Sequence, residues 1–221
     1  PGAAPAPPAT AGQPGGAPQG PPAPAPGAPG TNPPAPQLNN AAVKPPGFSV
    51  VAGYGCGSSA AQSFSEHDRY GGGATGWVAV GKGGWASDGC NGSFDTMPMS
   101  GSATSADSGI YAVWSFSPGT AGLTRATCQV QLYVPADHDP THVGGDPAHF
   151  QVYGSGDASG SMTSDFNVDQ FGYLGQWKPV GTFAVTKGTL SIKLDNRGLD
   201  WHSSTVTNAH LAVAQFRANC A

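Results

Sequence analysis

The densest group of chemically capable side chains lies in one short segment, ADHDPTHVGGDPAH. Its acids and imidazoles are Asp137, His138, Asp139, His142, Asp146 and His149. Carboxylate and imidazole groups are the usual ligands of Zn²⁺ or Cu²⁺, and Asp137, Asp139 and Asp146 could offer oxygen ligands to a structural Ca²⁺. The prolines and glycines of the segment also predict turns, in which aspartates cap the backbone and histidines are simply exposed. The sequence leaves both interpretations open and specifies no cofactor.

Aromatic side chains in glycine-rich or polar connections form the second group of candidates. A flat ring can stack on a sugar while nearby amides and carboxylates bond its hydroxyls. The rings in such connections are Tyr54, Tyr70, Trp77, Trp85 and Trp201. The same rings could equally anchor loops on a core. By contrast, the strand patterns around Trp114 and Trp177 predict that both are core residues.

Several function classes find no support in the sequence. No G-x-S-x-G elbow occurs and Glu66 is the only glutamate, so we expect no hydrolase triad, no paired glutamates and no enzyme. The formal net charge is −4 and the nine basic residues are scattered, which argues against nucleic-acid binding. No run of about 18 apolar residues predicts a membrane span.

Four cysteines predict two disulfides. Their number is even and no C-x-x-C pair occurs, which is typical of bridges in an oxidising compartment and not of a thiolate metal site. We favour Cys56 with Cys90 and Cys128 with Cys220, although the other two pairings stay open. Because the sequence starts at Pro1 and not at Met, a removed signal peptide and secretion are the simplest expectation.

Two regions of different composition follow one another along the chain. Residues 1–47 hold 16 of the 22 prolines and one charged residue, Lys44, which predicts a disordered Pro/Ala/Gly-rich tether. Residues 48–221 hold short alternating runs separated by turn residues, which predicts one all-β antiparallel sandwich. The run HLAVAQF near the C-terminus is apolar on both faces, as in a central strand covered on both sides.

An ordered series of motifs carries a family resemblance: WSFSP, CQVQLYVP, AHFQVY, VDQ, GQWKPVGTF and AVAQFR, all from residue 114 onward. The series resembles the golvesin C-terminal-like, or xanthan-lyase carbohydrate-binding-like, domain of secreted bacterial proteins. That resemblance implies a galactose-binding-type jelly roll over residues 48–220, with no catalytic residues to carry over. The expected function is a cell-surface or cell-wall-associated module that binds a polysaccharide or cell-wall glycan. The alternative is a structural or adhesive protein that binds itself or another protein through the sandwich.

Overall fold

The computed structural model describes residues 47–201 and 205–221. Within them the chain forms short strands and three single 3-10 turns, η1 (Gly73–Thr75), η2 (Pro118–Ala121) and η3 (Phe171–Tyr173). The strands are β1 (Phe48–Gly53), β2 (Gln62–His67), β3 (Asp95–Pro98), β4 (Tyr111–Phe116), β5 (Ala126–Val134), β6 (Ala148–Tyr153), β7 (Met162–Val168), β8 (Gln176–Val185), β9 (Leu190–Asp195), β10 (His210–Val213) and β11 (Gln215–Cys220). The predicted tether falls on residues outside the described part, except for Gly47, and stays a prediction.

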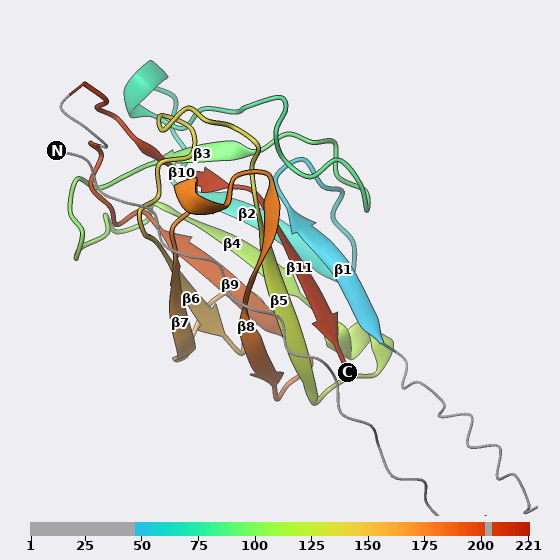
Figure 1. The fold of residues 1–221 in the computed structure, drawn as a ribbon. Helices are drawn as coiled ribbons and strands as arrows, with labels where there is room; N and C mark the ends of the chain where they lie inside the picture. The colour runs from blue at the N-terminus through green and yellow to red at the C-terminus, as the bar shows by residue number, and fades with distance from the viewer. Residues whose placement is uncertain (1–46, 202–204) are drawn as a thin grey trace, which may run out of the picture. The chain divides into compact units, whose positions relative to one another are not determined.

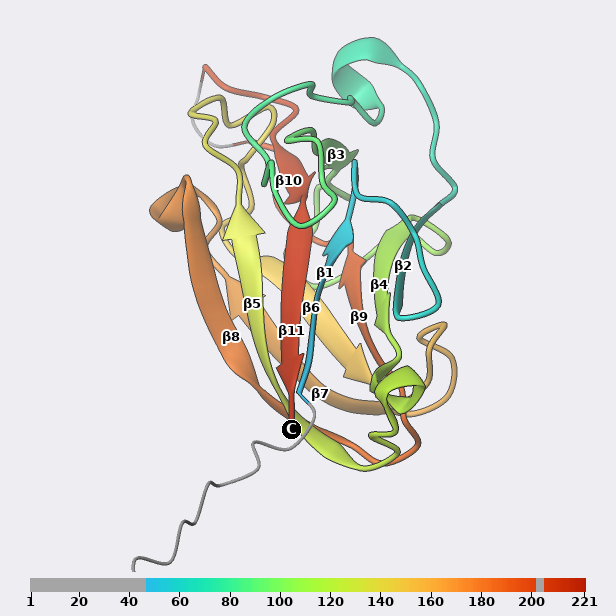
Figure 2. The same cartoon turned by 90° about the vertical axis from the view of Figure 1, so that its right-hand side faces the viewer.

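The strands build two facing antiparallel sheets (Figures 1 and 2). One sheet has the order β1-β11-β5-β8, and the other has the order β2-β4-β9-β6-β7. Without β2, which is added at one edge, these are the two four-stranded layers of a jelly roll. A small sheet of β10 and β3 lies at one end of the sandwich. The structure therefore confirms the predicted all-β, antiparallel jelly-roll sandwich.

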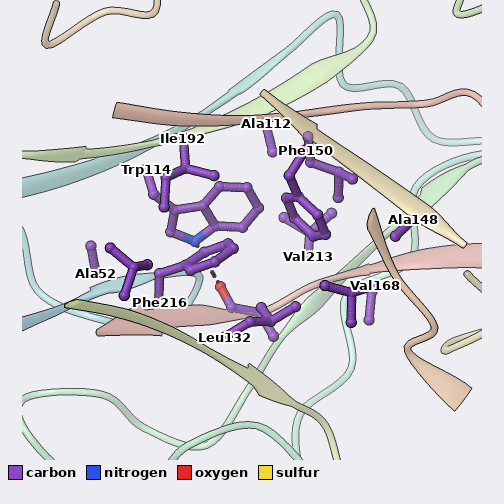
Figure 3. Packing of buried hydrophobic residues seen from close by; sticks show 14 of the residues in the cluster. Ala52, Ala112, Trp114, Leu132, Ala148, Phe150, Val168, Ile192, Val213 and Phe216 are labelled. Carbon is purple, nitrogen blue, oxygen red and sulfur yellow. Dashed lines mark hydrogen bonds between the residues drawn. The ribbon is translucent and has the colours of Figure 1, made fainter. Parts of the chain in front are cut away.

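The core lies between the two sheets and follows the predicted alternation. The predicted inward-facing residues are all buried, as expected when one face of a strand packs inward: Ala112, Trp114 and Phe116 of β4 and Cys128, Val130, Leu132 and Val134 of β5. Trp114 is completely buried, and its ring centroid lies 5.0 Å from that of Phe216 on the opposite sheet. Its Nε1 donates a 2.9 Å hydrogen bond to the Ala214 carbonyl oxygen (Figure 3). Trp114 is thus a core residue, as predicted.

The last apolar run forms two strands where the sequence predicts one. Residues 209–216 are all buried, so the expected cover on both sides is present. The run divides at Ala214, because β10 pairs with β3 while β11 lies between β1 and β5. The Ala214 carbonyl oxygen at this break accepts the Trp114 hydrogen bond.

Both disulfides have the favoured pairing. Cys128 and Cys220 are register partners on β5 and β11, so their bridge fastens the last strand to its neighbour. The Cys56–Cys90 bridge ties the segment after β1 to the loop before β3. These two bridges use all four cysteines, which excludes the other two pairings. In the described part of the chain, no helix is both long and apolar enough to cross a bilayer.

Candidate functional site

The aspartates and histidines of the 137–149 segment are mainly engaged in turns. His142 Nδ1 lies 2.8 Å from Asp137 Oδ2, and Asp139 Oδ1 accepts bonds from the backbone and hydroxyl of Thr141. The hydrogen bond from the Thr141 hydroxyl and, to a smaller extent, the bond from the Thr141 backbone N–H lower the pKa of Asp139. The other two candidates, His138 and Asp146, are exposed. Within residues 47–201 and 205–221 no group of three or more potential ligands could hold a metal ion. The geometry supports the turn interpretation and gives no support to a Zn²⁺, Cu²⁺ or Ca²⁺ site.

His149, the last histidine of this segment, belongs to a different network. Its Nδ1 lies 2.9 Å from Asp195 Oδ2, and its Nε2 lies 3.3 Å from Asp165 Oδ2. Arg197 also binds Asp195 through Nε and Nη2, at 3.0 and 2.8 Å. These residues come from β6, β7 and β9 and the segment after β9, so the network ties neighbouring strands of the five-stranded sheet together. It is not among groups that could hold a metal ion in the described part of the chain.

The aromatic candidates divide by exposure. Trp77 is only 4% exposed and packs in the core, so the prediction that it could stack on a sugar is wrong. Tyr54 and Trp85 are half-buried, whereas Tyr70 is 43% and Trp201 55% exposed. Trp177 opens β8 as expected but is half-buried on the outer face of its sheet, so its core assignment is wrong.

Tyr70 and the segment that contains Trp201 meet at a surface pocket of about 140 Å³. We call it the end pocket; its lining residues are Tyr70, Ala74, Thr75, Pro98, Met99, Asp200, Asn208, Ala209 and His210. The lining combines an aromatic ring and apolar carbons with a carboxylate, an amide and a hydroxyl. Trp201, whose side chain is 55% exposed, follows Asp200 directly in the sequence and pairs with Thr207 through an isolated backbone bridge, but it is not one of the residues that line the pocket.

Buried residues hold the pocket in place. His210 of β10 is 1% exposed, with Nε2 2.8 Å from the Gly76 oxygen and Nδ1 2.7 Å from the Asn208 oxygen. The Tyr70 hydroxyl donates to the Thr75 oxygen, and the Tyr70 carbonyl accepts from the backbone N–H of Trp77. Trp77 therefore fits the alternative prediction that such rings anchor loops on the core: it anchors the glycine-rich loop that presents Tyr70.

The end pocket has the features needed to hold one sugar ring. The exposed ring of Tyr70 offers flat apolar surface to the C–H face of a pyranose, and Trp201, which follows the lining residue Asp200, is a second exposed ring. Asp200 can accept, and Asn208 can both accept and donate, hydrogen bonds with the ring hydroxyls.

Sequence reasoning missed a buried carboxyl pair. Arg69 Nε lies 2.7 Å from Asp95 Oδ2 and 3.1 Å from Glu66 Oε2, and Asp95 is fully buried. Burial, then repulsion from Asp95, raises the pKa of Glu66 to about 8. Burial also raises the pKa of the nearby Tyr54. None of these residues lines the end pocket, so the carboxyl pair and its neighbours belong to the framework of the fold. The sequence does not reveal that Glu66 and Asp95 lie close together, because they are 29 residues apart.

Comparison with known proteins adds no family. No family model, no curated protein and no solved structure matches this chain.

Proposed function

We propose that this protein is a non-catalytic binding module for a polysaccharide or cell-wall glycan. The observation that carries the proposal is the end pocket, which Tyr70 lines together with Asp200 and Asn208, with the exposed Trp201 directly after Asp200 in the sequence. Tyr70 and Trp201 are the only two aromatic residues among the large side chains that the described residues leave exposed. An exposed aromatic ring beside convergent polar groups is the arrangement expected of a sugar site, and Trp201 offers a second exposed ring one residue from the pocket lining.

The cellular setting of this proposal is extracellular. Two disulfides are compatible with an extracellular location, since such bridges persist in oxidising compartments. The golvesin-like motif series supports the same setting, because that family is attached to secreted bacterial proteins. We therefore propose a secreted protein in which residues 1–47 act as a tether to the cell surface.

A pull-down on insoluble polysaccharides tests the proposal. The full chain is incubated with cellulose, chitin, and purified bacterial cell wall, and the bound fraction is compared with that of Tyr70→Ala and Trp201→Ala. Loss of one stacking ring is expected to weaken binding about five- to thirtyfold, since each aromatic anchor of this kind contributes on the order of 1–2 kcal/mol. Met162→Ala is the matched control, because Met162 is 49% exposed on β7 and does not line the pocket.

Two results would contradict the proposal. Equal binding by the wild type and both aromatic variants would remove the end pocket from the interaction. No binding by a folded wild type to any glycan, together with concentration-dependent assembly in sedimentation velocity, would instead support the structural or adhesive alternative.

A further inference from the structure

A second group of aromatic residues lies on the outer face of the sheet β1-β11-β5-β8. The ring centroids of Trp85, Tyr133 and Trp177 lie 5.2–5.5 Å from one another. Tyr133 and Trp177 are register partners on β5 and β8, and Trp85 comes from the loop before β3. The guanidinium of Arg217, on β11, lies 4.2 Å from the Trp177 ring centroid and 5.4 Å from that of Trp85. We call these four residues the sheet cluster.

A polar cavity of about 330 Å³ adjoins the sheet cluster. It is lined by Ser49, Val50, Val51, Ser59, Gln62, Asp88 and Arg217. Arg217 belongs to both, and Asp88 joins them: its Oδ2 accepts from Trp85 Nε1 at 2.9 Å and from Arg217 Nη2 at 3.1 Å. Within the described residues, the Arg217 side chain donates a hydrogen bond to Asp88 alone. The other N–H groups of the Arg217 guanidinium can therefore donate to a ligand in the cavity.

The loop that carries Trp85 and Asp88 is fixed to the sheet. The Trp85 backbone N–H donates to Gln215 Oε1 at 2.8 Å, and Gln215 is fully buried. Gln215 Nε2 in turn donates to the carbonyl oxygens of Tyr54 and Ser93, and the Cys56–Cys90 bridge closes the same loop. A site held this firmly loses little conformational entropy when a ligand binds.

The sheet cluster contains an unsatisfied donor. Trp177 Nε1 is buried and has no hydrogen-bond partner among the described residues. Such a donor costs about 1–3 kcal/mol in a native protein unless an outside group completes it.

We infer that the sheet cluster and its cavity form a second sugar-binding surface, which takes neutral pyranose units of the same polysaccharide; this inference rests on the proposed function. The half-buried rings supply apolar faces, Asp88 accepts and Arg217 donates hydrogen bonds to neighbouring hydroxyls, and Ser49, Ser59 and Gln62 add uncharged polar groups. The charges of Arg217 and Asp88 cancel, so the surface favours neutral over acidic sugars.

Binding through two surfaces has a measurable consequence. The end pocket and the sheet cluster with its cavity share no lining residue, so each can be removed separately. A long chain that reaches both gains affinity through effective concentration, whereas a short oligosaccharide occupies one surface at a time. Loss of either surface should therefore lower affinity for the polymer by tenfold or more, beyond its effect on short ligands.

Affinity electrophoresis of the full chain in gels containing soluble β-glucan, galactomannan, xylan or polygalacturonate tests this inference. The variants are Arg217→Ala, the milder Asp88→Asn and the double variant Tyr70→Ala/Trp201→Ala, each first checked for an unchanged melting temperature. We expect Arg217→Ala and Asp88→Asn to weaken retardation by a neutral polymer about tenfold, with the remainder lost when the end pocket is also changed.

The outcomes separate this inference from the proposed function. Unchanged retardation of both folded sheet variants, with binding lost in the end-pocket variant, would overturn the second surface and leave the proposed function standing. A loss confined to polygalacturonate would overturn the neutral-sugar assignment. No retardation of the wild type in any of these gels would overturn both.

Discussion

The buried carboxyl pair makes the stability of this protein depend on pH in a defined direction. Burial and Asp95 raise the pKa of Glu66 from 4.5 to about 8, and its Oε1 is buried without a partner among the described residues. Between these two values the folded state holds a proton that the unfolded state has released. The stability that protonated Glu66 gives the folded state is therefore fully present below pH 4.5. It is lost as the pH rises through about 8.

The size of the effect follows from the pKa difference. A shift from 4.5 to about 8 would correspond to about 5 kcal/mol if it were complete. Because the side chain of Glu66 keeps 12% of its exposure and water screens part of the interaction, we expect about 2 kcal/mol. Glu66→Gln keeps the shape and the hydrogen-bonding ability of the protonated acid but cannot ionise.

Urea unfolding followed by tryptophan fluorescence at intervals between pH 5 and 9 measures this. The free energy of unfolding of the wild type should fall by about 2 kcal/mol more than that of Glu66→Gln over this range. Asp146→Asn, which removes an exposed carboxyl group, should keep the wild-type slope. Parallel pH profiles for the wild type and Glu66→Gln would refute the reasoning.

Three further predictions concern the framework. Trp114→Phe removes the Nε1 bond to Ala214 and leaves a small cavity, so it should lower the free energy of unfolding by about 2–3 kcal/mol in urea; no loss would contradict the core assignment. Gly53 has φ +150° and a Cβ there would overlap the Ala214 carbonyl, so Gly53→Ala should cost about 2 kcal/mol or more by the same assay, whereas Gly57→Ala, with open space around it, should cost little. Replacing Cys128 and Cys220 by serine opens a bridge of sequence separation 92 and should cost about 4 kcal/mol, more than the matching Cys56/Cys90 double variant at separation 34; calorimetry that ranks them in reverse would contradict the chain-entropy argument.

The sandwich could be predicted from the sequence wherever one face of a strand is buried. The alternation around Trp114 and along residues 128–134 gave the correct inward faces, because burial on one side imposes a period of two. β2 and β3 lie in the glycine-rich region and were not predicted. β2 carries mostly polar residues, Gln62 to His67, so its sequence lacks the apolar alternation of an ordinary half-buried strand.

The candidate site could be predicted only in part. Tyr70 and Trp201 were selected by their place among glycines and polar residues and are exposed, but the same rule also selected Trp77, which is buried. The rule cannot separate a ring that stacks on a ligand from a ring that anchors a loop, since both need glycine-rich neighbours. The core prediction for Trp177 was wrong for a different reason. Trp177 lies on the outer face of the sheet as the register partner of Tyr133, and the sequence does not reveal this pairing.

The most direct test of the glycan-binding proposal observes the end pocket itself. Two-dimensional ¹H–¹⁵N NMR of the full chain is recorded while a soluble oligosaccharide of the bound polymer is added, with the Trp201 indole signal assigned by its loss in Trp201→Ala. We predict saturable shifts of the Trp201 indole and of the Tyr70 and Asn208 amides. Unchanged signals at these three positions, at concentrations that saturate the binding of the polymer, would contradict the proposed site.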